Sequence, residues 1–204
     1  MPCSGASAIG CGWSVSADRI VTEVVTAAEL KLRVGELGEE ISNDYHDSRP
    51  VLLAVLLGSM PFVADLARAI ETPVDIDFLA LTRFGEGGRI RIALDTSTPL
   101  QDRDVIIVED IVDTGLSLTV LRRMLTDRGA ASVATVALLD KVPRRVAQVP
   151  LEYRGFEVGD EFLIGYGLDY EGRFRNLPSI WAVLDWHELT TDPDRVTRLL
   201  YPGK

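Results

Sequence analysis

The feature that most constrains the fold is an abrupt change of character within residues 104–121. The segment Val105–Val108 is short, apolar and rich in β-branched residues, which is typical of a strand buried on both faces in a parallel sheet. Apolar residues then recur at helical spacing, at Leu116, Val120, Leu121 and Leu125. A helix is therefore predicted to begin near Gly115. The change from buried strand through glycine turn to helix indicates an α/β fold, with a central, mostly parallel sheet flanked by helices.

The turn between this strand and helix is predicted to carry chemistry. A turn at the carboxyl end of a strand leaves N–H groups and the positive end of a helix facing a crevice, where a phosphate can bind. Thr114 and Ser117 add hydroxyl donors, but three carboxylates would repel a polyanion: Glu109, Asp110 and Asp113. The conflict disappears if two of them hold sugar hydroxyls or a divalent cation and the third acts on a base beside the sugar. This combination indicates a phosphorylated sugar; the alternative is a solvated acidic turn.

The stretch closely resembles the phosphoribosyl-pyrophosphate motif of the type I phosphoribosyltransferases, and within them the hypoxanthine-guanine branch. Its signature is four hydrophobic residues, Glu109-Asp110, two aliphatic residues and Asp113-Thr114-Gly115. The resemblance implies the type I phosphoribosyltransferase fold, with a small hood subdomain. It also implies transfer of phosphoribosyl from 5-phosphoribosyl 1-diphosphate to a 6-oxopurine, hypoxanthine or guanine, with release of pyrophosphate in purine salvage.

The same resemblance implies roles for the residues of the motif. Glu109 and Asp110 would hold the ribose hydroxyls, and Asp113 would be the general base beside N7 of the purine. Ile111 would cover one face of the base. The 5′-phosphate would bind to the turn formed by Thr114, Gly115, Leu116 and Ser117.

A second strand, glycine turn and helix precede this motif. The segment Val51–Leu56 is apolar, Leu57-Gly58 follows it, and a helical pattern runs over 61–70. The turn resembles the family's pyrophosphate loop, in which a lysine is usual where this chain has Leu57. We expect the backbone of Leu57 and Gly58 still to bind pyrophosphate, but more weakly. A plain turn without a ligand is the alternative.

Residues 83–97 are predicted to form a long, mobile, glycine-rich loop after a strand over 73–82. In the family such a loop is a lid that commonly carries a Ser-Tyr pair, and Arg83-Phe84 stands in that place. Arg83 is a candidate to compensate for the charge missing at Leu57. The alternative is a solvated loop whose arginine has no specific role.

A further strand, predicted over 131–139, ends in Asp140-Lys141. A lysine at a strand end is ordinarily solvated. The segment resembles the family's purine-reading strand end, so Lys141 is expected to donate to the 6-oxygen of the base. A 6-amino group offers no acceptor there, so 6-oxopurines would be favoured.

Residues 161–170 resemble the family's base-binding hood segment. Phe162 would stack on the purine, and the backbone of Leu163 would meet its edge; the alternative for Phe162 and Tyr166 is ordinary core packing. Asp169 falls on the family's metal-linked carboxylate and Arg175 on its pyrophosphate-binding arginine. The implied cofactor is Mg²⁺, held by Asp169, Glu109 and Asp110.

Length and composition complete the expectations. The 204 residues are sufficient for one domain over 19–204, after a flexible tail over 1–18 that contains Cys3 and Cys11 as reduced residues. The hood would combine the N-terminal segment with about 155–185. The net charge of −10 argues against a nucleic-acid surface, and no apolar run approaches the roughly 20 residues of a membrane span. No secretory signal is recognised, so a cytoplasmic protein is expected, and the family resemblance implies a homodimer or homotetramer.

Two other functions are compatible with the sequence. One is the same chemistry on another base, such as xanthine or a deazapurine in a specialised pathway, because Leu57 and Arg83-Phe84 depart from the family pattern. The other is a regulator of this fold that binds nucleic acid. A basic surface or an added DNA-binding domain would distinguish the regulator, and the sequence displays neither.

Overall fold

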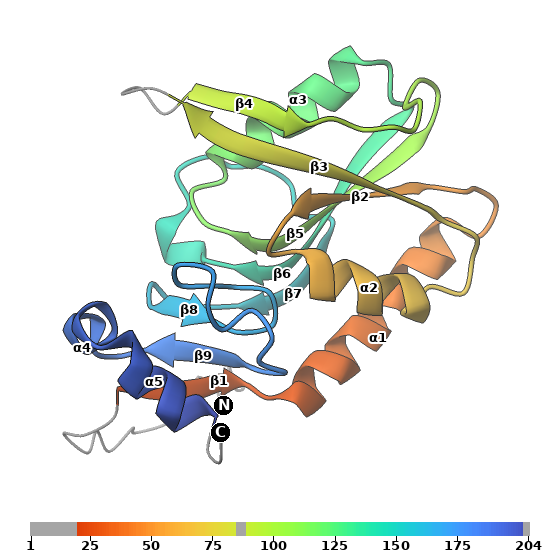
Figure 1. Ribbon diagram of the computed structural model, residues 1–204. Helices are drawn as coiled ribbons and strands as arrows, with labels where there is room; N and C mark the ends of the chain where they lie inside the picture. The colour runs from red at the N-terminus through yellow and green to blue at the C-terminus, as the bar shows by residue number, and fades with distance from the viewer. Residues whose placement is uncertain (1–19, 85–88, 202–204) are drawn as a thin grey trace, which may run out of the picture.

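The computed structural model describes residues 20–84 and 89–201 of the chain (Figure 1). The predicted tail over 1–18, with Cys3 and Cys11, lies outside these residues. Within the described part, strands form a six-stranded sheet and a separate three-stranded sheet. No helix there is long and apolar enough to cross a membrane.

The larger sheet has the strand order β4-β3-β2-β5-β6-β7. All neighbouring strands in it are parallel except β3 and β4, so it is a mostly parallel sheet, as predicted. In chain order its strands are β2 (Val51–Leu56), β3 (Asp75–Phe84), β4 (Arg89–Leu94), β5 (Asp104–Val112), β6 (Ser132–Asp140) and β7 (Tyr153–Glu157).

Both faces of this sheet are covered, and the covering explains the uninterrupted apolar runs in its central strands. Alternate residues of a strand point to opposite faces. Leu52 and Ile106 pack in one cluster with α1 (Ala27–Asp44) and α2 (Met60–Ala69). Val51 and Val105 pack in another with α3 (Leu116–Asp127). A strand buried on both faces has no solvent side on which polar residues would be favoured.

Local signals in the sequence explain where α1 begins and which face it buries. Thr26 is its N-cap and forms a capping box with Glu29, in which each side chain accepts from the other residue's backbone N–H. The apolar residues of the helix lie on one face and are buried: Leu30, Val34, Leu37 and Ile41. The helix ends at Asp44.

The structure corrects two of the predicted segments. First, β5 continues to Val112, so Glu109, Asp110 and Ile111 are strand residues and the turn is only 113–115. The strand continues because its residues still pair with β6, with Ile111 opposite Leu139. Second, the predicted long loop after residue 82 is largely a hairpin, because β3 continues to Phe84 and pairs antiparallel with β4.

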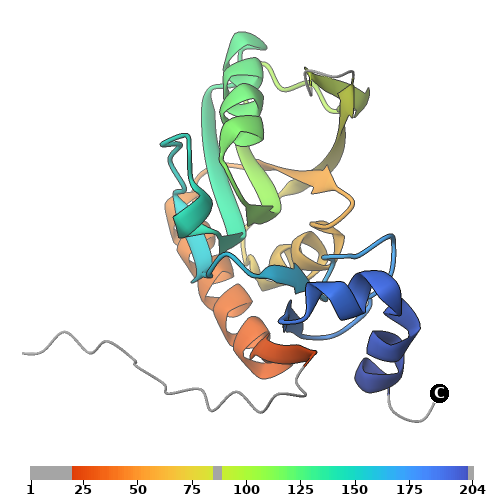
Figure 2. The same ribbon diagram turned by 90° about the vertical axis from the view of Figure 1, so that its left-hand side faces the viewer.

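The smaller sheet brings distant parts of the chain together. Its strand order is β1 (Val21–Val25), β9 (Ile180–Val183) and β8 (Phe162–Ile164), all antiparallel. The helices α4 (Trp186–Thr191) and α5 (Pro193–Leu200) follow β9 and lie with it below the larger sheet (Figure 1, Figure 2). Leu189 and Val196 from these helices are buried in a cluster with Ile164 and Val183.

Candidate active site

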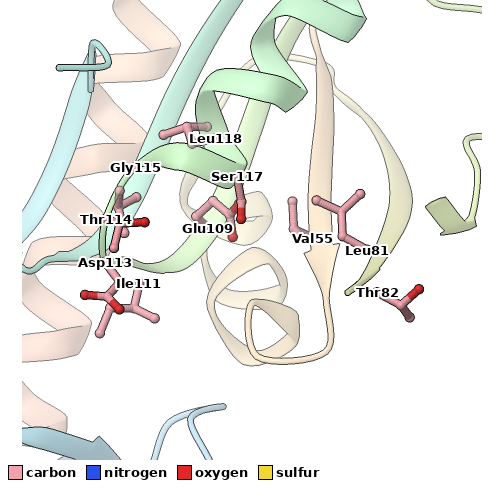
Figure 3. Close-up of a pocket in the computed structure, with 11 residues that line it drawn as sticks. Val55, Leu81, Thr82, Glu109, Ile111, Asp113, Thr114, Gly115, Ser117 and Leu118 are labelled. Carbon is pink, nitrogen blue, oxygen red and sulfur yellow. The ribbon is translucent and has the colours of Figure 1, made fainter. Parts of the chain in front are cut away.

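The first cavity of the site, here called the turn pocket, lies at the carboxyl ends of β2, β3 and β5 and the start of α3. Its volume is about 250 Å³. Figure 3 shows Glu109 and Ser117 pointing into the space between α3 and β2, with Val55 and Leu81 on the far side. The other residues around it are Thr82, Ile111, Val112, Asp113, Thr114, Gly115 and Leu118.

The turn itself is held in a conformation that requires glycine. Gly115 has φ +79°, in the left-handed region. A Cβ there would also lie 3.0 Å from the carbonyl oxygen of Ala147. The carbonyl of Thr114 accepts hydrogen bonds from the N–H groups of Val146 and Ala147, each at 3.0 Å. The segment after β6 therefore holds the turn from below, while the first N–H groups of α3 remain at the pocket.

Glu109 and Asp110 diverge because they are neighbours on a strand. Glu109 lines the turn pocket, whereas Asp110 lines a second cavity on the other side of β5. Burial raises the pKa of the Glu109 carboxyl well above its usual range, and the adjacent charge of Asp110 raises it further. Burial likewise raises the pKa of Asp110, to about 6.

The predicted pyrophosphate loop packs directly against Asp110. A Cβ on Gly58 would lie 1.6 Å from the Asp110 Oδ2 atom, so only glycine allows this approach. On its other side, the Gly58 carbonyl oxygen lies against Gly167, where a Cβ would come within 1.9 Å of it. The Leu57 side chain is 61% exposed beside this contact. The loop is thus wedged between β5 and the hood segment.

The second cavity, here called the hood pocket, has a volume of about 570 Å³. It brings together residues from β5, from the segment after β6 and from the hood: Asp110, Ile111, Asp113, Lys141, Arg144, Asp160, Phe162, Leu163, Leu168, Asp169 and Trp186. Ile111 and Asp113 line both cavities. The two pockets therefore meet at the end of β5.

Lys141 is buried at the hood pocket, contrary to the usual exposure of lysine. Its Nζ atom donates to the carbonyl oxygen of Glu161 at 2.7 Å and to that of Asp160 at 3.4 Å. These carbonyls orient the ammonium without a carboxylate partner at that point. A polar cation held in this way has donor capacity directed at the pocket.

Asp113 and Asp169 each form an ion pair with an arginine. Arg144 Nε lies 2.6 Å from the Asp113 carboxylate, and Arg144 also contacts Asp160 at 3.0 Å. On the opposite side of the pocket, Arg175 lies 2.6 Å from Asp169 and donates to the carbonyl of Gly167. The charges of Arg175 and Asp169 both act on Asp110, since the first lowers and the second raises its pKa.

Comparisons with known proteins agree with this geometry. Residues 21–171 match the family described as "Phosphoribosyl transferase domain". The hypoxanthine-guanine phosphoribosyltransferase of Bacillus subtilis is 40% identical over 161 residues, covering 77% of this chain and 89% of the relative. The hypoxanthine phosphoribosyltransferase of Escherichia coli K12 is 40% identical over 170 residues, covering 80% and 96%.

The chain belongs to the hypoxanthine-guanine phosphoribosyltransferase family. Among solved structures, a hypoxanthine-guanine phosphoribosyltransferase from Bacillus anthracis superposes with a TM-score of 0.78 at 35% identity, covering 81% of this chain and all of that one. A hypoxanthine phosphoribosyltransferase from Staphylococcus aureus gives 0.77 at 35% identity, covering 79% and 90%. The type I phosphoribosyltransferase fold predicted from the sequence is thereby confirmed.

Most of the residues that were predicted from the phosphoribosyltransferase motifs lie at the two pockets. Thr114, Gly115 and Ser117 line the turn pocket, and Lys141, Phe162, Leu163 and Asp169 line the hood pocket. Leu116 lines neither, since its side chain is 54% exposed on the first turn of α3. Tyr166, expected as a core aromatic, is buried and donates to Asp65 at 2.6 Å.

The predicted lid residues occupy a different kind of element in this phosphoribosyltransferase. Arg83 and Phe84 are the last two residues of β3, and their side chains lie outside what the structure describes. Leu81 and Thr82, earlier on the same strand, line the turn pocket. The hairpin therefore borders the turn pocket through its strand residues.

Sequence reasoning missed four residues of the hood pocket: Arg144, Asp160, Leu168 and Trp186. Arg144 stands in a short 3₁₀ turn three residues after Lys141, and that proximity was a usable signal. Asp160 and Trp186 carried no such signal, because only the tertiary fold brings the start of β8 and the end of β9 to the same cavity.

Proposed function

We propose that this protein transfers the phosphoribosyl group of 5-phosphoribosyl 1-diphosphate to a 6-oxopurine, hypoxanthine or guanine, in purine salvage. The observation that carries the proposal is the meeting of two pockets at the end of β5, one built on a helix N-terminus and one around a buried lysine. The relatives at 40% identity are named as hypoxanthine and hypoxanthine-guanine phosphoribosyltransferases.

The turn pocket would bind the 5′-phosphate. Backbone N–H groups at the start of α3 and the hydroxyls of Thr114 and Ser117 are suited to phosphate oxygens. Glu109 lines the same pocket and would hydrogen-bond a ribose hydroxyl. Asp110, on the other face of the strand, would approach the ribose from the hood side.

The hood pocket would bind the purine. Phe162 and Ile111, which line this pocket, would cover the faces of the purine, and Leu163 would meet its edge. Lys141, oriented by the carbonyls of Asp160 and Glu161, would donate a remaining N–H to the 6-oxygen. An adenine 6-amino group would leave this buried cation without an acceptor, which disfavours it strongly.

Asp113 lies where the two pockets meet and would act as the general base at N7. Its carboxylate is held by Arg144, so the base is oriented before the purine arrives. The carboxylates at the end of β5 also provide negative charge beside a sugar carbon that develops positive character as pyrophosphate departs. Arg175 and the backbone around Gly58 would receive the pyrophosphate, with Leu57 contributing no charge.

The residues present are compatible with Mg²⁺ that the substrate helps to hold. Among the described residues, no group of three or more His, Cys, Asp or Glu side chains forms a ready metal site. Mg²⁺ ordinarily keeps several waters and uses one or two carboxylates together with substrate phosphates. Asp110 and Asp169 line the same pocket and would hold it, whereas Glu109 faces the other pocket. When bound, the ion would offset the charge of the departing pyrophosphate.

A cytoplasmic location, a single domain with a hood and a homodimeric or homotetrameric assembly remain predictions. Each is compatible with a salvage enzyme that acts on small metabolites.

Pyrophosphate release with Mg²⁺ and 5-phosphoribosyl 1-diphosphate tests the proposal, with hypoxanthine, guanine, xanthine, adenine and a deazaguanine supplied one at a time. Turnover of hypoxanthine or guanine but not adenine is the expected result. Turnover of only xanthine or the deazaguanine would refute hypoxanthine and guanine as the substrates and keep the chemistry. Absence of pyrophosphate release with every base would refute the transfer reaction itself.

A further inference from the structure

Trp186 stands at the hood pocket although it lies beyond residues 21–171, which match the phosphoribosyl transferase domain. The family match ends at residue 171, and Trp186 is the first residue of α4. Trp186 is 52% exposed, so a large part of its surface is open to contact with a ligand. That surface lines the hood pocket together with Phe162 and Asp160.

Three aromatic rings meet edge to face at this wall of the pocket. The ring centroids of Trp186 and Phe162 are 4.9 Å apart, and those of Trp186 and Tyr170 are 5.8 Å apart. Phe162 and Tyr170 complete the group at 6.2 Å. Such pairs are attractive beyond simple burial, and each ring restricts the orientation of the others. Phe162 is thus braced by Trp186 on one side and Tyr170 on another.

Hydrogen bonds and buried side chains on both sides of Trp186 fix the backbone that carries this ring. The N–H groups of Leu184 and Asp185 donate to the carbonyl oxygen of Ile20, which ties the end of β9 to the start of β1. Asp185 then caps α4 by accepting from the N–H of Glu188 at 2.9 Å. Leu189 of α4 and Val196 of α5 are fully buried beneath the small sheet. Figure 1 shows α4 directly after β9 at the edge of that sheet.

We propose that Trp186 is a specificity-determining residue that forms the outer wall of the purine site and holds Phe162 in its stacking orientation. The inference rests on the proposed function, since the ligand of this wall is the purine ring of the base or of the nucleotide product. Trp186 contributes to binding of the purine and not to binding of 5-phosphoribosyl 1-diphosphate, because it lines only the hood pocket.

Steady-state kinetics of W186A and W186F test the contribution to affinity. W186A raises the KM for hypoxanthine about three- to tenfold, with the KM for 5-phosphoribosyl 1-diphosphate unchanged, and W186F recovers most of the loss because it keeps an aromatic ring. Leu199→Ala is the matched control, since Leu199 is equally exposed on α5 and does not line the pocket. An unchanged KM for the base in W186A, or an equal rise in both KM values, would overturn the proposal.

Tryptophan fluorescence during titration with GMP gives a readout that needs no turnover. GMP quenches the wild type and W181F but not W186F, because the indole of Trp186 faces the site and Trp181 is hydrogen-bonded to Ser179 within the small sheet. Quenching of the wild type by GMP, without turnover of any base, would refute the transfer reaction and support the placement of Trp186 at the nucleotide site. Turnover of a base, with quenching that persists in W186F, would refute that placement of Trp186 and leave the proposed function intact.

Discussion

The two pockets that meet at the end of β5 are built in opposite ways. Most of the turn pocket comes from one short segment, 109–118, whose strand end, turn and helix start are consecutive. The hood pocket collects residues from β5, from the turn after β6, from the start of β8 and from the start of α4. A contiguous site is organised by local backbone geometry, whereas a dispersed site depends on the packing of separate elements. Substitutions should therefore act differently on the two pockets.

The largest expected effect is at Asp113, which belongs to both pockets. Asp113→Asn removes the proposed base but keeps the shape of the side chain, so kcat falls about 10²- to 10⁴-fold with little change in stability. Steady-state kinetics with hypoxanthine measures it. Asp160→Asn is the control, because Asp160 shares Arg144 with Asp113 without reaching the turn pocket. A fully active Asp113→Asn enzyme would refute the role.

The contiguous pocket should be sensitive to a single backbone position. Gly115→Ala places a side chain at φ +79°, which costs about 1–2 kcal/mol and displaces the turn. The KM for 5-phosphoribosyl 1-diphosphate should rise about five- to thirtyfold if that cost falls on the bound turn. Gly129→Ala is a matched control with φ +83° away from both pockets. It should lower stability and leave that KM unchanged; equal kinetics for the two variants would contradict the argument.

Ionisation of Asp110, in the hood pocket, is expected to lower the stability of the folded protein. Its folded-state pKa of about 6 lies above its ordinary value of 3.8, so ionisation opposes folding and stability is lost as the pH rises through this window. Asp110→Asn should therefore be more stable than the wild type by about 2–3 kcal/mol at pH 7.5, and by almost nothing below pH 4. Urea unfolding at the two pH values measures the difference.

Asp75→Asn should behave in the opposite way. A hydrogen bond from Arg103, with the charge of Arg49, lowers the pKa of Asp75. Its contribution to stability is present at neutral pH and is lost as the pH falls through the lowered pKa.

An Asp110→Asn gain in stability that is equal at both pH values would show that the gain does not come from ionisation of Asp110.

The smallest expected effect is at Leu57, on the loop between the two sides. Leu57→Lys restores a cation on an exposed side chain and should tighten pyrophosphate binding about two- to fivefold. Leu57→Gln controls for length without charge. Calorimetric titration with pyrophosphate measures the affinities. Equal affinities in the two variants would show that the positive charge at residue 57 does not tighten binding.

The comparison also explains which parts of the site were predictable. Thr114, Gly115 and Ser117 were found because a buried strand, a glycine turn and an amphipathic helix are signals that span a few residues. Lys141 and Phe162 were found only through resemblance to family motifs, since a lysine at a strand end and an aromatic in a hood have ordinary structural alternatives. The loop predicted over 83–97 is largely a hairpin, because the pairing of β3 with β4 outweighs the glycine content, and the lid role stays a prediction.

The sequence by itself determined the local elements: the capped first helix, the apolar central strands and the turn that leads into α3. These depend on backbone hydrogen bonds and burial patterns that repeat every few residues. Only the tertiary structure decided that Glu109 and Asp110 line opposite pockets, that Arg144 holds Asp113, and that Trp186 lines the hood pocket. The physical reason is that strand pairing and packing between distant segments set these positions, and neither is encoded in neighbouring residues alone.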